Sequence, residues 1–316
     1  MFRPQIKVLD CTIRDGGLIN KWRFNDDLVR KVFIALSQAG VDYMEIGYKS
    51  SDKYFSREEN GAWKFCTEDD LKRIIGEYET GMKLSAMADI GRIDYHDIPD
   101  KKESALDMIR VACYVKEVDK GISLAHHCME KGYDTTINLM AVSKVLERDL
   151  DEALEDLSKS HVPVVYVVDS FGAMYSEQIH FLAKKYFEAL PGKELGIHTH
   201  NNQQLAFANT IEAIIAGINR IDATIYGMGR GAGNCPLELL LSFLKNPKFD
   251  IRPIFEVIQE IFIPLKSDTE WGYHIPYLIT GILNEHPRSG IKAMSEKKMP
   301  DLRRFYDDLK DGTPLD

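Results

Sequence analysis

A long alternation of apolar runs with amphipathic segments occupies residues 6 to about 245, and it constrains the fold more than any other feature of the sequence. Continuous apolar runs of this kind are typical of strands that a parallel sheet buries on both faces. They lie at 6–9, 43–47, 83–89, 109–113, 136–140, 162–169, 195–197 and 221–226. Eight strand–helix units in about 245 residues predict a (β/α)8, or TIM, barrel, with a doubly wound α/β sheet as the alternative.

The segments between these runs carry the signals of helix ends. Asn25, Thr67 and Ser176 are predicted to cap helices, and Pro236 is expected to be the first residue of the last barrel helix. The polar stretch between the third and fourth runs predicts only a weak helix. Other helices are expected over about 118–131, 149–159 and 203–216.

From about residue 246 the alternation is lost and the character of the chain changes. We therefore divide the chain into a catalytic barrel, residues 1–245, and a helical extension, residues 246–316, packed on the barrel or on a neighbouring subunit. Because barrels with a hydrophobic appendage often pair, a homodimer is a candidate assembly. The extension gathers aromatic residues: Phe249, Phe255, Phe262, Trp271, Tyr273 and Tyr277.

Composition excludes several classes of function. The net charge of −9 provides no basic excess to neutralise phosphates, so we expect no nucleic-acid partner. The five cysteines are scattered and never form a Cys-x-x-Cys pair, which indicates a reducing compartment. Residues 1–10 lead almost directly into a strand-like run and no window is long and apolar enough to span a membrane, so we expect no signal peptide, no membrane partner and a cytoplasmic protein.

Two histidines follow the seventh apolar run. Residues two apart on a strand point to the same side, so His198 and His200 can converge on one point beyond the strand end. Two neutral imidazoles provide half of a divalent-metal site. The alternative is a pair of histidines packed in the core or exposed on a loop.

Active sites of barrels lie at the C-terminal ends of the strands, so the polar residues there are the candidates for chemistry. Asp15, after the first strand, can reach a metal held by the two histidines, because the first strand neighbours the eighth and lies near the seventh. The alternative interpretation of Asp15 is that it is a turn residue, since Asp-Gly is common in turns. The other polar residues at strand ends are Arg14, Glu45, Asp89, Arg110, Asn138, Asp169 and Ser170.

Two further features could serve such a site. Arg14 can stabilise a developing enolate oxygen with its permanently charged fork of donors, its alternative being a surface or salt-bridging arginine. The glycine-rich stretch 227–234 lets backbone approach a ligand closely, but no Lys-Ser/Thr pair follows it, so it is not a P-loop. Asn234 is a candidate fourth metal ligand or a cap of the next helix, and we interpret Cys235 as a passive thiol.

Three motifs together resemble the signatures of the DRE-TIM metallolyases, a superfamily that includes 4-hydroxy-2-oxovalerate aldolase, hydroxymethylglutaryl-CoA lyase and the isopropylmalate and homocitrate synthases. They are the stretches 10–16, 198–202 and 227–238, and the resemblance covers roughly residues 5–245. It implies a (β/α)8 barrel with a divalent metal held by Asp15, His198 and His200. Asn234 would lie near or on the metal, and Arg14 would steady the enolate of a pyruvate-like or acyl unit.

The glycine stretch looks most like that of the aldolase branch, because the synthases usually carry Glu-Arg where this chain has Arg230 and Gly231. One departure is Leu18, which stands where the aldolases carry a histidine that acts as general base. Tyr48 and His274 are candidate replacements. The C-terminal segment does not resemble the dehydrogenase-docking domain of the bacterial aldolases, so we expect no partner dehydrogenase.

The sequence therefore predicts a divalent-metal-dependent carbon–carbon lyase of aldolase type, acting on a small 2-oxo acid or related hydroxyacid through a metal-stabilised enolate. The predicted metal is Mn²⁺ or Mg²⁺, with Zn²⁺ or Co²⁺ as alternatives. Two other functions stay open: a Claisen-type synthase that joins an acyl-CoA to a 2-oxo acid, and a catalytically silent metal-binding barrel with a regulatory role. The predicted catalytic residues are Arg14 and Asp15, and the predicted substrate-binding residues are Glu45, Asp89, Arg110, Asn138 and Asp169.

Overall fold

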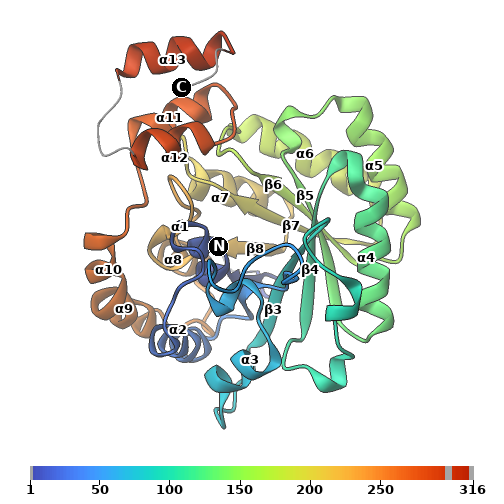
Figure 1. Cartoon of the computed structure of the whole chain (residues 1–316). Coiled ribbons are helices and arrows are strands. Elements are labelled where there is room, and N and C mark those ends of the chain that lie inside the picture. The colour runs from blue at the N-terminus through green and yellow to red at the C-terminus, as the bar shows by residue number, and fades with distance from the viewer. Residues whose placement is uncertain (1–2, 296–300, 313–316) are drawn as a thin grey trace.

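The computed structural model describes residues 3–295 and 301–312, and at its centre lies a closed parallel barrel (Figure 1). Neighbouring strands pair in chain order, and β1 pairs with β8 to close the sheet. The predicted (β/α)8 barrel is confirmed, and the doubly wound sheet is not formed. The strands are β1 (Lys7–Asp10), β2 (Tyr43–Tyr48), β3 (Lys83–Asp89), β4 (Met108–Tyr114), β5 (Asp134–Met140), β6 (Val164–Asp169), β7 (Glu194–Thr199) and β8 (Arg220–Ala223).

Helices surround the barrel, as Figure 1 shows. The connection from β3 to β4 differs from the other six, because in place of an α-helix it holds two 3-10 turns, at Tyr95–Asp97 and Lys101–Glu103. The helices up to the end of the barrel are α1 (Thr12–Asn20), α2 (Asp26–Gln38), α3 (Glu68–Ile75), α4 (Val118–Glu130), α5 (Glu147–Lys159), α6 (Ser176–Ala189), α7 (Ala206–Ala216) and α8 (Leu237–Leu244).

The predicted helix starts are correct in two cases and displaced by one residue in two others. The Asn25 side chain accepts a hydrogen bond from the Leu28 N–H at 2.8 Å, and Thr67 caps α3. Ser176, in contrast, is the first helical residue of α6 and not its cap. Pro236 is the N-cap of α8 and not its first residue, because its ψ of 128° is extended.

Helix α1 was not predicted, because its sequence contains two successive glycines that read as a turn. The structure shows why glycine is required inside this helix. A Cβ on Gly17 would lie 2.0 Å from Cδ1 of the Trp22 ring, and one on Gly16 would lie 2.9 Å from Sδ of Met228. Both glycines therefore permit close packing of the helix on its neighbours, and the turn interpretation of this stretch is wrong.

Strand β8 ends three residues earlier than predicted. The chain leaves the sheet after Ala223 and forms a 3-10 turn at Ile225–Gly227, where Tyr226 adopts a positive φ of 55°. Apolar residues continue through this turn because it is buried, and a run of apolar residues does not by itself distinguish a buried strand from a buried turn.

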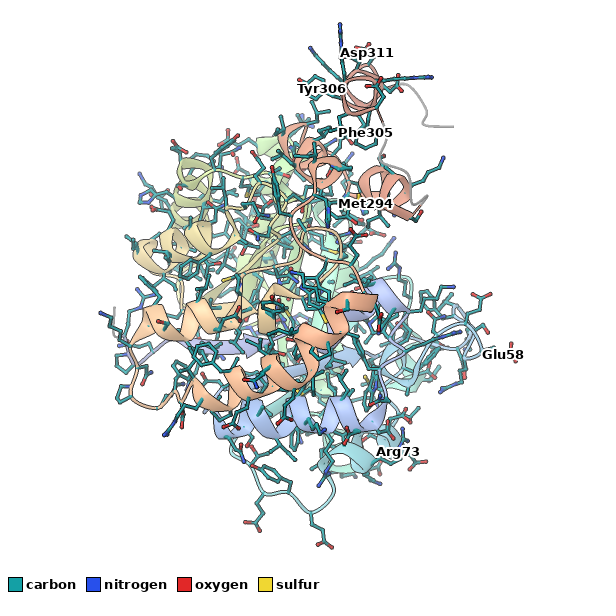
Figure 2. The ribbon with its side chains drawn as sticks, turned by 90° about the vertical axis from the view of Figure 1, so that its left-hand side faces the viewer. Glu58, Arg73, Met294, Phe305, Tyr306 and Asp311 are labelled. Atoms are coloured by element: carbon teal, nitrogen blue, oxygen red, sulfur yellow. The ribbon has the colours of Figure 1, made fainter. Side chains whose placement is uncertain are left out.

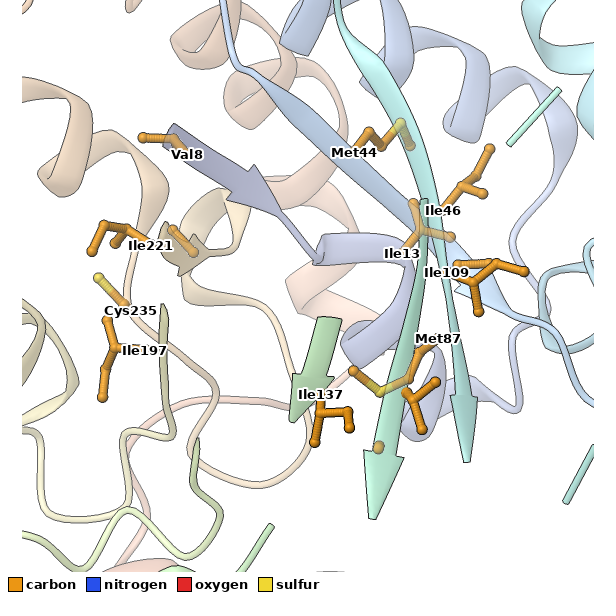
Figure 3. Packing of buried hydrophobic residues seen from close by; sticks show 14 of the residues in the cluster. Val8, Ile13, Met44, Ile46, Met87, Ile109, Ile137, Ile197, Ile221 and Cys235 are labelled. Carbon is orange, nitrogen blue, oxygen red and sulfur yellow. The ribbon is translucent and has the colours of Figure 1, made fainter. Parts of the chain in front are cut away.

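The main hydrophobic core fills the space between the strands and the outer helices. Figure 3 shows this packing around side chains such as Val8, Ile46 and Ile197. A smaller cluster of Leu9, Cys11, Tyr43 and Met108 is separate from this main core. Because all eight strands are parallel in the closed barrel, the residues that follow their C-terminal ends gather at one end of the barrel.

The described residues after 245 are mostly helical, as predicted, and their first part packs into the core of the barrel. Ile254 and Phe262 belong to the same buried cluster as the barrel, and α9 packs against α2. Figure 2 shows α13, with Phe305 and Tyr306, standing away from the barrel. The helices are α9 (Arg252–Val257), a π-helical turn (Ile258–Phe262), α10 (Ile263–Asp268), α11 (Ile275–Ile282), α12 (Arg288–Ser295) and α13 (Leu302–Lys310).

Within residues 3–295 and 301–312, none of the helices has both the length and the apolar character that crossing a bilayer requires.

Candidate metal centre and active site

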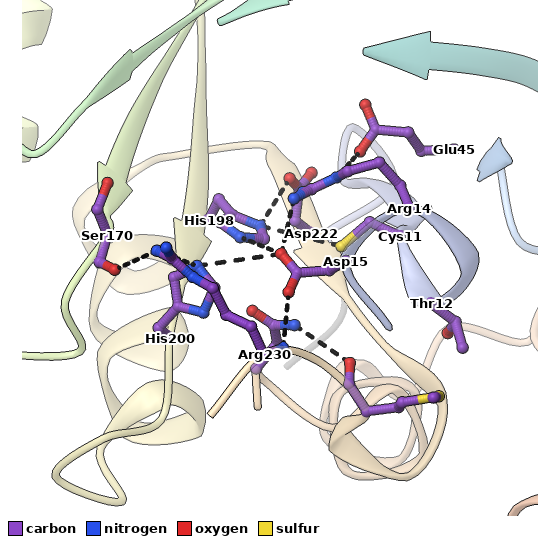
Figure 4. A network of polar contacts seen from close by, with 12 residues as sticks. Cys11, Thr12, Arg14, Asp15, Glu45, Ser170, His198, His200, Asp222 and Arg230 are labelled. Atoms are coloured by element: carbon purple, nitrogen blue, oxygen red, sulfur yellow. Dashed lines mark hydrogen bonds and ion pairs between the residues drawn. The ribbon is translucent and has the colours of Figure 1, made fainter. Parts of the chain in front are cut away.

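Three potential ligands converge at the C-terminal end of the barrel (Figure 4). Asp15 comes from the first turn of α1, and His198 and His200 come from the end of β7. Their ligand atoms all lie within 4.8 Å of one another. The Asp15 Oδ2 atom is 3.6 Å from Nε2 of His198 and 4.0 Å from Nε2 of His200. The structure thus brings together the three residues that the sequence singled out.

The opening motif holds Asp15 in place through a chain of hydrogen bonds. The Asp10 carboxylate accepts from the Thr12 N–H at 3.0 Å and from the Thr12 hydroxyl at 2.7 Å. The same hydroxyl accepts from the Ile225 N–H at 2.8 Å, which ties the start of α1 to the loop after β8. These bonds hold the first turn of α1, which carries Asp15, against the end of β1 and against the loop after β8.

Asp15 is fully buried, yet its surroundings favour the charged form. Burial opposes ionisation, but the Arg14 guanidinium and the two imidazoles outweigh it and hold the pKa of the Asp15 carboxyl well below its ordinary value. Arg14 Nη1 donates to Oδ2 at 2.6 Å, and the Arg230 backbone N–H donates to Oδ1 at 3.1 Å. A buried carboxylate of this kind is suited to hold a cation.

His198 is oriented by a second carboxylate, which sequence reasoning missed. Its Nδ1 lies 3.1 Å from Oδ2 of the buried Asp222. A hydrogen bond from Nδ1 to a carboxylate fixes the tautomer that leaves Nε2 free to bind metal. The Nε2 atom of His198 is indeed buried without a hydrogen-bond partner and faces Asp15. The sequence offered one sign of this role, because Asp222 is an aspartate within the otherwise apolar eighth run.

His200 is held in its neutral form. Burial lowers the pKa of this imidazole well below its usual value, and the attraction of Asp15 does not compensate. Its Nε2 lies 3.5 Å from Nη2 of Arg230, whose guanidinium also donates to the Ser170 carbonyl at 2.8 Å. Neutral imidazole is the form that binds divalent metals.

Asn234 lies beside this cluster and forms an isolated antiparallel bridge with His200. Its Nδ2 donates to the Met228 carbonyl at 3.2 Å, while its Oδ1 is buried without a partner. Gly229 makes this approach possible, because a Cβ there would lie 2.1 Å from Nδ2 of Asn234. Asn234 does not cap α8, so of its two predicted roles only the one near the metal ligands agrees with its position.

The donor set fits a divalent cation on two observations made within the described residues. His198 Nε2 and Asn234 Oδ1 are buried acceptor-capable atoms without partners, and such atoms are costly unless something binds them. A carboxylate with two imidazoles and an amide oxygen is a mixed oxygen–nitrogen set that suits Mn²⁺, Mg²⁺, Co²⁺ or Zn²⁺.

A buried layer of alternating charges supports the cluster from below. Glu45 Oε2 accepts from Arg14 Nε at 2.7 Å and from Arg110 Nη1 at 3.1 Å. Arg110 Nη2 then donates to Asp222 Oδ2 at 2.6 Å. The layer thus links Arg14 to the carboxylate that orients His198, and it places Glu45 and Arg110 behind the site.

A cavity of about 320 Å³ opens above the cluster, a volume that suits a small-molecule ligand. Asp89 and Asn138 line it, and each presents a buried polar atom without a partner: Oδ1 of Asp89 and Nδ2 of Asn138. One is an acceptor and the other a donor, so the cavity offers complementary contacts to a polar ligand.

Of the remaining predicted residues, one lines the cavity and the others do not. Glu45, Arg110 and Asp169 do not line the cavity, and the Asp169 carboxylate accepts from the N–H groups of Ala173 and Met174 in the loop after β6. Tyr48 does line the cavity, whereas His274 lies outside it and pairs with Glu270 at 3.0 Å. Arg110 and Asp169 are thus positioned to organise the site and its loops.

Sequence reasoning also missed part of the cavity wall. Arg92, from the loop after β3, and Arg230 line the cavity, as do His286 and Arg288 from the C-terminal helices. His286 and Arg288 follow the barrel in the sequence. They are therefore not among the residues at strand ends, where active-site residues of a barrel are expected.

Comparison with known proteins agrees with this geometry. The HMGL-like family matches residues 5–261. A 4-hydroxy-2-oxovalerate aldolase from Thermus thermophilus is 32% identical over 270 residues, 82% of this chain and 75% of the relative. An oxaloacetate decarboxylase from Mycobacterium tuberculosis is 32% identical over 245 residues, 76% of this chain and 70% of the relative. The solved N-terminal domain of a Bacteroides vulgatus protein is 29% identical with a TM-score of 0.77, and the match covers 92% of this chain and 97% of that domain. The chain belongs to the HMGL-like family, and its resemblance to the DRE-TIM metallolyases is confirmed.

Proposed function

We propose that this protein is a divalent-metal-dependent carbon–carbon lyase of aldolase type that acts on a 2-oxo acid. Asp15, His198 and His200 would hold the cation, with Asn234 Oδ1 as a fourth ligand and Mn²⁺ or Mg²⁺ as the preferred ion. The observation that carries the proposal is the buried carboxylate–imidazole cluster, with an unpartnered His198 Nε2, at the base of a substrate-sized cavity. The family match and the aldolase relatives support the same reaction class.

The chain's own residues supply substrate binding and charge stabilisation. A bound cation acts as a Lewis acid toward the keto acid. Arg14 lines the cavity and is held by Glu45 and Asp15, so its guanidinium is preorganised to stabilise the negative oxygen of an enolate. The Nδ2 group of Asn138 donates to the substrate and helps to orient it.

Cleavage of a 4-hydroxy-2-oxo acid also needs a base for the hydroxyl proton. Leu18 lines the cavity and cannot accept a proton. We assign this role to Asp89, whose Oδ1 is buried, unpartnered and on the cavity wall, while its Oδ2 is held by Arg92 at 2.9 Å. As Asp89 takes the proton, the C3–C4 bond breaks, the aldehyde leaves, and the electron pair of the bond forms the enolate.

A second candidate reaction is decarboxylation of a 2-oxo diacid, which releases carbon dioxide and needs no base for a hydroxyl group. The apolar side chain of Leu18 in the cavity wall favours it, as does the similarity to an oxaloacetate decarboxylase.

Turnover with added Mn²⁺ tests the proposal. We expect the protein to release pyruvate from a 4-hydroxy-2-oxo acid, and we expect D15N to lose this activity together with stoichiometric metal binding. The matched control is D27N, because Asp27 is an exposed carboxylate on α2. Carbon dioxide release from oxaloacetate alone would favour the decarboxylase, and release of free CoA thiol from an acyl-CoA would indicate the Claisen-type synthase. Metal binding without turnover on any of these substrates would contradict a catalytic role and favour a regulatory barrel.

A further inference from the structure

The C-terminal helices contribute to the wall of the active-site cavity. His286 precedes α12, and Arg288 and Ile291 lie in it, and all three line the cavity. The family model matches residues 5–261, so this part of the wall lies outside the matched segment. Residues that line the cavity away from the metal cluster are a natural place for substrate selection.

The charges in the cavity are not balanced. Of its arginines, Arg14 is paired with Asp15 and Glu45, and Arg92 is paired with Asp89 at 2.9 Å. Among the described residues, the Arg230 guanidinium contacts the Ser170 carbonyl, His200 and His286 and forms no ion pair, although Asp15 attracts it from a longer distance. Arg288 is an exposed residue, and its side chain forms no ion pair with a carboxylate within residues 3–295 and 301–312.

An acidic side chain at the cavity does not correct this imbalance. Glu117 also lines the cavity, but it lies 3.3 Å from Lys120 and has its own cation. Two arginines that line the cavity therefore lack a directly paired carboxylate among the described residues, in a chain whose net charge is −9. Binding one anionic group would compensate only one of them.

The two arginines occupy different positions along the cavity. Arg230 reaches the metal cluster, since its Nη2 is 3.5 Å from His200 Nε2. His286 lies on the other side of this guanidinium, at 3.3 Å from Nη1, and its Nδ1 accepts from the Arg288 N–H at 3.1 Å. Arg230 is thus the arginine beside the metal cluster, and Arg288 begins the segment on the far side of His286.

We propose that the preferred substrate is a 2-oxo acid that carries a second anionic group at its distal end, and that Arg288 of α12 binds this group. Arg230 then binds near the keto-acid end beside the metal ligands. The inference rests on the proposed function and specifies its substrate class. Carboxylate and phosphate share the chemistry that a guanidinium recognises, so both are candidates for the distal group.

The reaction balances with such a substrate. The hydroxyl proton moves to Asp89, the C3–C4 bond breaks, and an aldehyde that retains the anionic tail leaves. The electron pair becomes the enolate, C3 takes up a proton to give pyruvate, and the proton held by Asp89 is returned, directly or through solvent, so that no net proton is gained or lost. Arg288 contacts a part of the substrate that does not react, so it determines specificity and is not catalytic.

The test compares 4-hydroxy-2-oxo acids whose tails end in a methyl, a carboxylate or a phosphate group, in the presence of Mn²⁺. We expect wild-type kcat/KM to be at least tenfold higher for a charged tail than for the methyl tail. In R288Q this preference should fall at least tenfold, mainly through KM, and R288K should restore part of it. R303Q is the matched control, because Arg303 is an exposed arginine of α13.

The outcomes separate the two proposals. A higher rate with either the carboxylate or the phosphate tail supports the inference and identifies the distal group. Equal kcat/KM for charged and neutral tails, or a preference that R288Q leaves intact, overturns the inference while the lyase proposal stands. Absence of turnover on every tail counts against the proposed function itself.

Discussion

At the scale of single residues, the two histidines of the site, His198 and His200, have different environments. Burial lowers the pKa of His198, but the carboxylates of Asp15 and Asp222 on its two sides outweigh burial and raise the pKa. His200 lacks such support, and burial lowers its pKa. A bound cation would bring both to the neutral form, because the charge of the ion opposes protonation.

Asp89 gives a prediction about pH. Burial raises the pKa of its carboxyl, despite the nearby cations of Arg92, Lys64 and Arg14. A base must be ionised to accept a proton, so kcat/KM should fall as the pH drops through a value above the ordinary aspartate range of about 4. D89N should lower kcat by about 10²–10⁴-fold and remove this acidic limb from the profile. A D89N profile with the wild-type limb would show that another group is the base.

At the scale of secondary structure, α1 explains both a success and a failure of sequence reasoning. The chemistry of Asp15 could be proposed because barrel sites follow strand ends. The helix around it could not, because consecutive glycines normally indicate a turn and the packing partners Trp22 and Met228 become visible only in three dimensions. Asp222 was missed for a similar reason, since its role depends on His198 in the adjacent strand.

A pair of substitutions tests this account of α1. Gly17→Ala places a Cβ against the Trp22 ring, which is buried and anchored by a hydrogen bond to the Arg14 carbonyl at 2.9 Å. We expect a loss of about 1–3 kcal/mol in the free energy of unfolding, measured with urea. Gly16→Ala meets only the flexible end of Met228, so its cost should be smaller. Equal stability of G17A and wild type would refute the packing argument.

At the scale of the whole molecule, the barrel was predictable from the sequence and the contribution of the C-terminal helices was not. The eight apolar runs predict the barrel, because each strand that is buried on both faces needs a continuous apolar segment. The extension has no comparable period. Its residues His286 and Arg288 reach the cavity through tertiary packing alone. The division into 1–245 and 246–316 stays a proposal, and α9 and the π-helical turn share the core of the barrel.

A comparison of two phenylalanines measures how strongly the extension is coupled to the barrel. Phe262 is fully buried in the main core, and Phe255, from the preceding helix, is half exposed. We expect F262A to destabilise the protein by about 3–5 kcal/mol in a single thermal transition. F255A should change stability by less than about 0.5 kcal/mol. Unfolding of the extension in F262A before an unchanged barrel transition would show that the two parts are independent.

The most direct test of the metal centre is anomalous diffraction from crystals grown with Mn²⁺ and the pyruvate analogue oxalate. We predict one strong peak between Asp15 Oδ2, His198 Nε2 and His200 Nε2, with oxalate bound to the same ion and Asn234 Oδ1 beside it. The structure contains a second potential cluster, formed by Cys11, His198 and Asp222. A peak at that cluster, or no manganese between the three predicted ligands, would contradict the account.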